Sequence, residues 1–383
     1  MNPNRLSSID TLRGLVMVIM ALDHVRAMLA PPHPPGFDFG DADPSLFFTR
    51  WVTHLCAPTF ILLAGISAYL YGTRASGRLG HSRFLVTRGL WLVVVEFTFI
   101  GFAFNFNLGP QYIPIMQVIW VIGVSMIVLG AIIWLPRGVI AVFAIGLICG
   151  HNMLDAIQPS TTDASALWLI FHIQGFVTVG SQPIGFVVYP LVPWLGVMAL
   201  GYLIGPLFGS GNPARASLLI KTGVSVILVF VALRWFGLYG EPGDWSVNEA
   251  IGATLVDFLH TTKYPPSLQF LLMTLGPALL LLGLFEKGRG PLSDALIVIG
   301  RVPFLFYVLH LYVIHLVAIA VGKFQGFSVS DIAVAFVRYP TDFGIGLGPI
   351  YLLWVIISLS LYPVCKWFAE LKARRRDWWL SYL

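Results

Sequence analysis

The sequence is poor in charge. Asp, Glu, Lys and Arg make up 11% of the 383 residues, and 57% are hydrophobic, whereas soluble domains contain about 25% charged residues. This composition excludes a soluble globular core and predicts a polytopic membrane protein. No cleavable signal peptide is expected, because the first apolar segment contains Asp23 and His24 and lacks a small-x-small cleavage site.

Several chemical motifs are also absent. The three cysteines, Cys56, Cys149 and Cys365, form no disulfide or metal-ligand pattern, so we expect them to be buried as small apolar residues and expect no metal. There is no P-loop, dinucleotide-binding loop, G-x-S-x-G or H-E-x-x-H, which argues against a metalloprotease or a serine hydrolase. Basic residues lie at helix ends rather than along one face, so no nucleic-acid partner is expected.

What the sequence does contain is a series of long apolar segments. Ten of them are long or apolar enough to span about 30 Å of hydrocarbon. We therefore predict an all-α membrane protein with about ten transmembrane helices and one domain over residues 1–383. The segments lie near 12–30, 50–72, 87–107, 114–135, 137–150, 184–208, 216–238, 266–285, 300–322 and 346–368.

The orientation follows from the positions of lysine and arginine. Placing the N-terminus inside puts 17 of the 23 basic residues on the cytoplasmic side, and the basic C-terminal tail then requires both termini to be cytoplasmic. The longer outer connections carry acidic residues such as Asp43, Asp155 and Glu241. The six basic residues that depart from the rule are Arg26, Arg50, Arg234, Lys263, Lys323 and Arg338.

Three smaller features allow two interpretations each. The semi-apolar run from Ala166 to Val179, which includes His172, is too short for a span and would suit an interfacial or re-entrant helix. Gly201 and Gly205 form a G-x-x-x-G, which suits internal helix packing or the face of a homodimer. The polar group His151, Asn152 and Asp155 could be functional or simply solvated loop residues.

The first apolar helix is unusual because it carries ionisable groups at both ends. Asp10 and Arg13 lie near its start, and Asp23, His24 and Arg26 lie near its end. A charged side chain at membrane depth costs roughly 2.5–3.5 kcal/mol, so such groups seldom lack a function. We therefore expect one end to handle a cytosolic donor and the other a partner near the far face.

The second span adds Arg50 and His54, which share a helix face at a depth similar to that of His24. One interpretation is a structural ion-pair cluster. The other is an active site, since histidine suits proton transfer near neutrality. In that case His24 or His54 is the general base, Asp23 orients it or the substrate, and Arg50 holds an acceptor or carbonyl oxygen.

Two further segments offer substrate contacts. Tyr307 and His310 share a face of the ninth span, and His315 lies nearer its outer end. These histidines could instead bond a neighbouring helix, which is worth only about 0.6 kcal/mol. Lys263-Tyr264-Pro265-Pro266-Ser267 is mainly a turn signal before the eighth span. We regard Lys263, Tyr307 and His310 as candidate substrate contacts.

An anionic donor could be held by arginines at the cytoplasmic rim, because guanidinium groups match phosphate oxygens in bidentate geometry. The alternative is that these residues only anchor the helices by the positive-inside rule. The candidates are Arg13, Arg83, Arg88 and Arg301.

Six motifs along the chain are distinctive in combination: S-I-D-T-L-R-G, L-D-H-V-R, R-W-V-T-H-L-C-A-P-T-F, Y-P-L-V-P-W-L-G-V-M-A-L-G-Y, K-Y-P-P-S-L-Q-F-L-L-M-T-L-G-P and G-R-V-P-F-L-F-Y-V-L-H. Together they resemble the heparan-alpha-glucosaminide N-acetyltransferase family, and more closely its bacterial branch within the transmembrane acyltransferase superfamily. The resemblance implies a many-helix fold that moves acetyl from cytosolic acetyl-CoA to a sugar across the membrane. It places Asp10, Arg13 and Gly14 at the family signature, so we group them with the donor-binding residues.

The sequence also departs from the lysosomal members of that family. Asp23 stands where they carry asparagine, and His54 stands where they carry aspartate. Their luminal-loop histidine has no counterpart here, because the region reads D-A-D-P-S-L. We therefore expect His24 or His54 to take its place.

The predicted function is an integral inner-membrane acetyltransferase that acts on the amino or hydroxyl group of an envelope saccharide. Transfer could be direct or could pass through an acyl-histidine. A small-molecule transporter, which would also need intramembrane charges, is the main alternative from another class. An assembly protein that has lost activity is a third.

Overall fold

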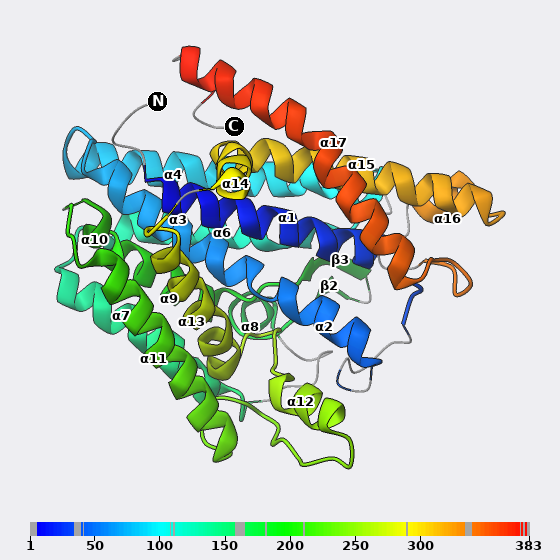
Figure 1. Cartoon of the computed structure of the whole chain (residues 1–383), viewed down its shortest axis with the longest axis horizontal. Coiled ribbons are helices and arrows are strands. Elements are labelled where there is room, and N and C mark those ends of the chain that lie inside the picture. The colour runs from blue at the N-terminus through cyan, green and yellow to red at the C-terminus, as the bar shows by residue number, and fades with distance from the viewer. Residues whose placement is uncertain are drawn as a thin grey trace. The chain divides into compact units, whose positions relative to one another are not determined.

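The computed structural model describes residues 6–33, 40, 42–107, 109, 112–157, 165–180, 182–209, 211–288, 290–333, 339–375, 377 and 380 (Figure 1). Helices dominate this part of the chain. Seven of them are long and apolar enough to cross a membrane, so the protein is a polytopic membrane protein. They are Pro44–Gly72, Gly77–Asn105, Arg137–Leu154, Leu191–Gly209, Arg215–Trp235, Pro303–Phe324 and Leu347–Arg374.

The other three predicted spans are also helical, but they differ from these seven. Two shorter apolar helices, α6 (Val118–Ile132) and α13 (Leu268–Leu284), occupy the fourth and eighth predicted segments. The first segment is α1 (Ser7–Leu29), whose 23 residues include two acidic and two basic side chains. The ten-span arrangement stays a prediction for these three helices.

The chain forms two compact units that are interleaved in sequence. Unit 1 comprises Met1–Cys56, Thr98–Tyr112 and Gly288–Leu383, and unit 2 comprises Ala57–Phe97 and Ile113–Lys287. In addition to α1, unit 1 contains α2 (Pro44–Thr53), α5 (Gly101–Asn105), α14 (Pro291–Arg301), α15 (Pro303–Phe324), α16 (Val329–Ala333) and α17 (Leu347–Arg374).

Within unit 1, α1 packs very closely against α14. A Cβ atom on Gly14 would lie 2.0 Å from the carbonyl oxygen of Leu296, and one on Gly300 would lie 1.9 Å from that of Asp10. Only glycine fits at either position, since real Cβ atoms are not found so near a backbone oxygen. The two contacts also show that α14 runs antiparallel to α1.

Helix α17 also runs antiparallel to α1. The amide of Ile345, just before α17, donates to the carbonyl of Leu29 at the end of α1 (2.8 Å). Further along α17, Trp354 Nε1 donates to the carbonyl of Val18 (2.8 Å). The end of α17 therefore lies toward the same side of unit 1 as the start of α1.

Unit 2 holds most of the remaining helices. They are α3 (Cys56–Gly72, with Cys56 in unit 1), α4 (Gly77–Val95), a π-helix (Glu96–Ile100) that crosses into unit 1, α6, α7 (Arg137–Gly150), a 3-10 helix (His151–Leu154), α8 (Ala166–Phe171), α9 (Leu191–Ile204), α10 (Pro206–Gly209), α11 (Arg215–Trp235), α12 (Ile251–Leu259) and α13.

The G-x-x-x-G of α9 serves packing inside the chain. A Cβ on Gly201 would lie 2.2 Å from the carbonyl oxygen of Leu62, and one on Gly205 would lie 2.4 Å from Cβ of Tyr69, both on α3. The internal-packing interpretation is therefore confirmed, and nothing in these contacts supports the homodimer.

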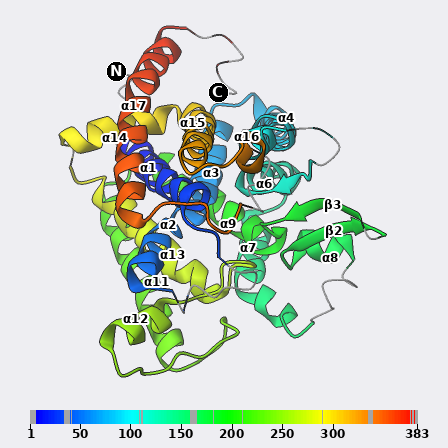
Figure 2. The same ribbon diagram turned by 90° about the vertical axis from the view of Figure 1, so that its right-hand side faces the viewer.

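A small sheet replaces part of a predicted helix. Its strands are β1 (Ile115–Met116), β2 (Gly175–Val179) and β3 (Gln182–Val187), in the order β1-β3-β2, with β3 parallel to β1 and antiparallel to β2. Figure 2 shows α8 beside β2 and β3. The expectation of a helix over Ala166–Val179 is thus wrong beyond Phe171. The segment Gly175–Val179 is rich in β-branched and aromatic residues, which fit a strand better than a helix.

Buried Glu96 stabilises the start of α6 from another helix. One of its carboxylate oxygens accepts the amide of Trp120 (2.7 Å), and the amide of Ile119 also donates to the carboxylate. The first amides of a helix have no partner within the helix. Glu96 therefore caps the N-terminus of α6, because Gln117 at the N-cap position makes no side-chain capping bond.

One of the basic residues that depart from the positive-inside rule, Arg234, has several local partners. Arg234 is buried and donates to the carbonyl oxygens of Gly243, Asp257, Phe258 and His260 at 2.7–3.0 Å. These bonds hold the segment that follows α11. Arg338 lies outside the described residues.

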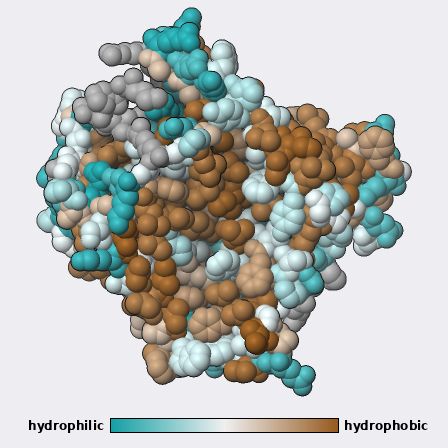
Figure 3. All heavy atoms as spheres, viewed as in Figure 1, coloured by the Kyte–Doolittle hydropathy of each residue, from teal (hydrophilic) through white to brown (hydrophobic). Residues whose placement is uncertain are grey.

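Hydrophobic side chains cover broad areas of the surface in the space-filling view (Figure 3). Exposed examples include Val142 on α7 and Leu228 on α11, as expected of helices that face lipid. Cys56 and Cys365 are buried as predicted, but Cys149 is exposed on α7, so that expectation is wrong for it. Its helix presents much of its apolar surface outward.

Candidate active site

The start of α1 carries a charged cluster within unit 1. Arg13 Nη1 donates to Asp10 Oδ1 (3.3 Å) and to the carbonyl of Gly300 (3.2 Å). Arg301 Nε lies 3.9 Å from Asp10 Oδ2. The structure therefore brings together four predicted donor-binding residues, Asp10, Arg13, Gly14 and Arg301. Gly14 acts there as a packing contact.

The other two predicted donor-binding residues, Arg83 and Arg88, lie on α4 in unit 2. Arg83 is exposed, and Arg88 is half-buried. They are five residues apart, so about 140° separates them around the helix and they do not share a face of α4.

At the far end of α1, His24 meets a histidine from α15. His24 Nδ1 lies 2.7 Å from His310 Nε2, and the rings stack with centroids 5.0 Å apart. His310 is fully buried and His24 is half-buried. Tyr307 and Phe104 approach the His24 ring edge-on, with centroids 6.2 and 5.9 Å away. Three of the predicted site residues, His24, Tyr307 and His310, thus form one cluster.

The hydrogen bonds of this cluster assign the tautomers of both neutral rings. His310 Nδ1 lies 2.9 Å from the carbonyl oxygen of Phe306. A carbonyl oxygen only accepts, so Nδ1 of His310 carries the proton and its Nε2 is an acceptor. Nδ1 of His24 must then donate to it. This leaves Nε2 of His24 as the unprotonated, basic nitrogen of the pair.

A positive group lies next to the end of α1. Arg26 Nη2 pairs with Asp23 Oδ1 at 2.8 Å, and both residues belong to the last turns of the helix. Burial, followed by the charges of Arg26 and Arg50, lowers the pKa of His33. Arg50 therefore acts on the same group as Arg26, which supports the predicted proximity of these two arginines. His33 was not among the predicted site residues.

His54 ends α2, where the second predicted span divides into α2 and α3. Its backbone amide donates to the carbonyl of Trp51 (3.1 Å), and its side chain is buried. Arg50 lies in the last turn of α2. The histidine that bonds to His24 directly is His310, which sequence reasoning placed with the substrate contacts.

Lys263 lies in unit 2, in the turn before α13. It is buried, pairs with Pro266 across the turn, and places its ammonium 5.2 Å from the centroid of the Tyr264 ring. The turn is confirmed. Next to it, Glu241 accepts from Thr262 and Ser267 side chains (both 2.5 Å).

Glu96 is the main buried acid that sequence reasoning missed. A single acidic residue inside the apolar stretch 87–107 is a signal that could have identified it, since such residues are rare at membrane depth. Its capping bonds to α6 give it a structural role. Among the described residues, no group of histidine, cysteine or acidic side chains is arranged to hold a metal ion.

The chain matches a known protein family over more than half of its length. The family described as heparan-alpha-glucosaminide N-acetyltransferase, catalytic, matches residues 5–235. A comparison with curated proteins found no match. The matched segment includes α1 and His24 but ends before α15, which carries His310.

Proposed function

Because the chain belongs to the heparan-alpha-glucosaminide N-acetyltransferase family and is an acetyl-CoA-dependent membrane acetyltransferase, we propose that His24 and His310 are its transfer centre. The acceptor is an amino or hydroxyl group of a saccharide on the extracytoplasmic side of the bacterial inner membrane. The observation that carries the proposal is the partly buried 2.7 Å contact between the two imidazoles on helices α1 and α15.

In the proposed reaction, Nε2 of His24 is the general base. It takes a proton from the acceptor amine or hydroxyl while the acceptor atom attacks the thioester carbonyl. The C–S bond breaks, and the proton passes from His24 to the departing thiolate, which leaves as CoA. Positive charge on His24 is stabilised by its Nδ1–H bond to His310, since a bond from a charged donor is stronger than a neutral one.

His310 is a positioning residue in this scheme. Its own Nδ1–H is fixed by the carbonyl of Phe306, so it can only accept from His24. That bond holds the His24 ring with its basic nitrogen directed away from His310. A histidine oriented in this way needs no carboxylate partner, and Asp23 is left to neutralise Arg26.

The donor is proposed to bind toward the start of α1. Asp10 and His24 are 14 residues apart, which corresponds to about 21 Å along the helix axis. Arg13 and Arg301 there could contact the phosphates of acetyl-CoA. Arg83 and Arg88 belong to unit 2 and stay candidates from the sequence alone. Saccharide contacts are assigned to Tyr307 and Arg50 of unit 1, and Lys263 of unit 2 stays a candidate from the sequence alone.

The proposed topology has ten spans and two cytoplasmic termini. The seven long apolar helices together with α1, α6 and α13 would make ten. The antiparallel pairing of α17 with α1 supports an arrangement in which both ends of the chain face one side. The positive-inside rule makes that side the cytoplasm.

The test measures acetyl-CoA cleavage and transfer by the full chain in nanodiscs. We expect His24→Gln to lose at least 99% of activity while still binding acetyl-CoA, because removing a general base typically lowers the rate by roughly 10²–10⁴-fold. His315→Gln, at another buried histidine of α15, is the matched control and should retain activity. Wild-type activity in folded His24→Gln protein would overturn the assignment.

The same preparation separates the remaining alternatives. Labelled acetyl groups trapped on His24 in a single turnover would replace the direct route by an acyl-histidine relay. Substrate flux in proteoliposomes without CoA would favour the transporter instead.

A further inference from the structure

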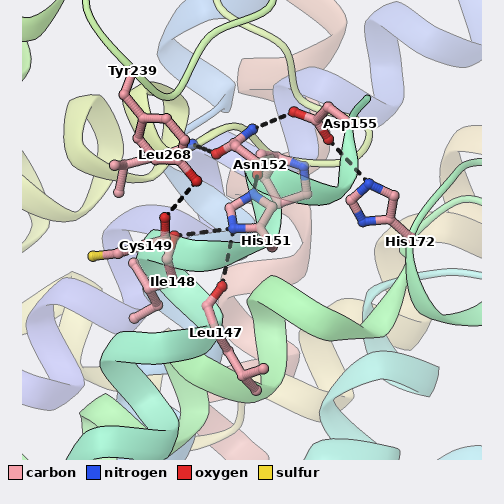
Figure 4. Close-up of polar contacts among 10 residues, drawn as sticks. Leu147, Ile148, Cys149, His151, Asn152, Asp155, His172, Tyr239 and Leu268 are labelled. Carbon is pink, nitrogen blue, oxygen red and sulfur yellow. Dashed lines mark hydrogen bonds and ion pairs between the residues drawn. The ribbon is translucent and has the colours of Figure 1, made fainter. Parts of the chain in front are cut away.

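A second group of polar side chains lies entirely in unit 2, where α7 ends (Figure 4). His151 anchors it. Its Nδ1 contacts the carbonyl oxygens of Leu147 and Ile148 (both 3.0 Å), and its Nε2 contacts that of Pro266 (2.7 Å). Because carbonyl oxygens accept and cannot donate, His151 ties the end of α7 to the turn before α13. This residue is structural, contrary to the solvated-loop interpretation.

Beside His151, a series of contacts that begins at Leu268 leads to a buried histidine. The amide of Leu268 donates to Asn152 Oδ1 (2.9 Å), and Asn152 Nδ2 donates to Asp155 Oδ2 (2.7 Å). Asp155 Oδ1 lies 3.0 Å from His172 Nε2. Figure 4 shows these contacts as a connected series from Leu268 through Asn152 and Asp155 to His172. Each member therefore fixes the orientation of the next.

This chain sets the state of the His172 ring. The carboxylate of Asp155 faces Nε2, so Nε2 carries the proton and Nδ1 has the lone pair. Burial lowers the pKa of His172, and Asp155 opposes that effect. His172 is only 1% exposed, and neither of its ring nitrogens has a partner in hydrogen-bond geometry among the described residues, so the 3.0 Å contact of Nε2 with Asp155 is an electrostatic one.

Trp168, whose ring lies beside that of His172, also has a buried polar atom without a hydrogen-bond partner in the described part of the chain. This atom is the indole Nε1–H. The rings of Trp168 and His172 have centroids 4.9 Å apart. Leaving a buried donor and a buried acceptor unpaired is unfavourable, so the pair fits a group that accepts from the indole and donates to the imidazole.

We propose that Trp168 and His172 bind a hydroxyl group of a saccharide. A hydroxyl can accept from Trp168 Nε1–H and donate to His172 Nδ1 at the same time, whereas an ammonium group has no lone pair to accept with. The indole ring offers an apolar surface for the C–H groups of a pyranose. That the ligand is a saccharide rests on the proposed function, but Trp168 and His172 belong to unit 2, whereas His24 and His310 belong to unit 1.

The experiment titrates methyl α-glucopyranoside into the full chain, without acetyl-CoA, by calorimetry. The protein is held in phosphatidylcholine nanodiscs, since that headgroup has no hydroxyl. Trp168→Phe removes the indole donor and keeps an aromatic ring, and Trp235→Phe makes the same change at an exposed tryptophan of α11. We expect Trp168→Phe to bind about five- to tenfold more weakly than wild type, as for one lost hydrogen bond, and Trp235→Phe to be unchanged.

His172→Gln should weaken binding similarly, and a thermal melt verifies that this buried variant is folded. Equal affinity in Trp168→Phe and Trp235→Phe would overturn the proposal. So would the absence of saccharide binding at the highest soluble concentration, which would leave water as the occupant. Loss of saccharide binding in phosphatidylglycerol nanodiscs would reassign the site to a lipid hydroxyl. Because no donor is present, failure here is distinct from failure of His24 in transfer.

Discussion

Replacing His310 tests the tautomer argument without touching the proposed base. His310→Leu keeps a buried apolar side chain of comparable size but removes the acceptor for His24 Nδ1–H. A hydrogen bond to a charged group is worth about 1.5–3 kcal/mol, and each 1.4 kcal/mol corresponds to a factor of ten in rate. We therefore expect kcat to fall by about 10- to 100-fold. KM for acetyl-CoA should change little, because the donor is proposed to bind at the other end of α1.

The matched variant is His310→Gln, whose amide oxygen can still accept from His24. It should recover most of the activity that His310→Leu loses. The assay is steady-state CoA release by folded protein in nanodiscs, with acetyl-CoA and acceptor varied separately. Equal losses of kcat in the leucine and glutamine variants would refute the hydrogen-bond explanation and leave only a packing role for His310.

Three further predictions concern stability. Glu96→Ala should lower stability by about 1–2 kcal/mol through loss of the α6 cap, and Glu96→Gln by less; equal thermal midpoints for alanine and wild type would contradict the capping role. Gly300→Ala should destabilise by about 1–3 kcal/mol, because its Cβ would lie 1.9 Å from a backbone oxygen. Gly146→Ala, in open space on α7, is the control and should be neutral or stabilising. Because burial lowers the pKa of His172, unfolded chains bind more protons as the pH falls below about 6.5. Stability should then fall with pH, and thermal midpoints in His172→Gln should fall less steeply.

The long apolar helices could be predicted because hydrophobicity and length are properties of a local stretch. The turn at Lys263 and the charged start of α1 were accessible for the same reason. The boundary between α8 and β2 was harder. Leu169 packs with Val177 and Val187 in one small core, so the strand owes its form to residues that follow it in sequence.

The pairing of His24 with His310 depends on contacts that no local pattern encodes. The two residues are 286 positions apart, and each lies on an apolar helix where a single histidine has several ordinary explanations. Because His54 and His24 were expected at a similar depth in the membrane, His54 was the expected neighbour of the groups at the end of the first helix. Depth constrains one coordinate only, and the close packing of Gly14 and Gly300 determines which helices lie beside α1.

The family match covers only one of the two histidines of the proposed transfer centre. Residues 5–235 contain His24, but α14 and α15 lie beyond them. Unit 1 nevertheless needs both parts of the chain, since α14 packs against α1 at Gly14 and α15 supplies His310. A protein that retained only the matched segment would keep the proposed base and lose both its orientation and the Arg301 contact to Asp10. If the reasoning is right, residues 1–235 expressed alone should show no acetyl transfer, and co-expression with residues 236–383 should restore it. Activity of the first fragment alone would show that His24 needs no partner from α15.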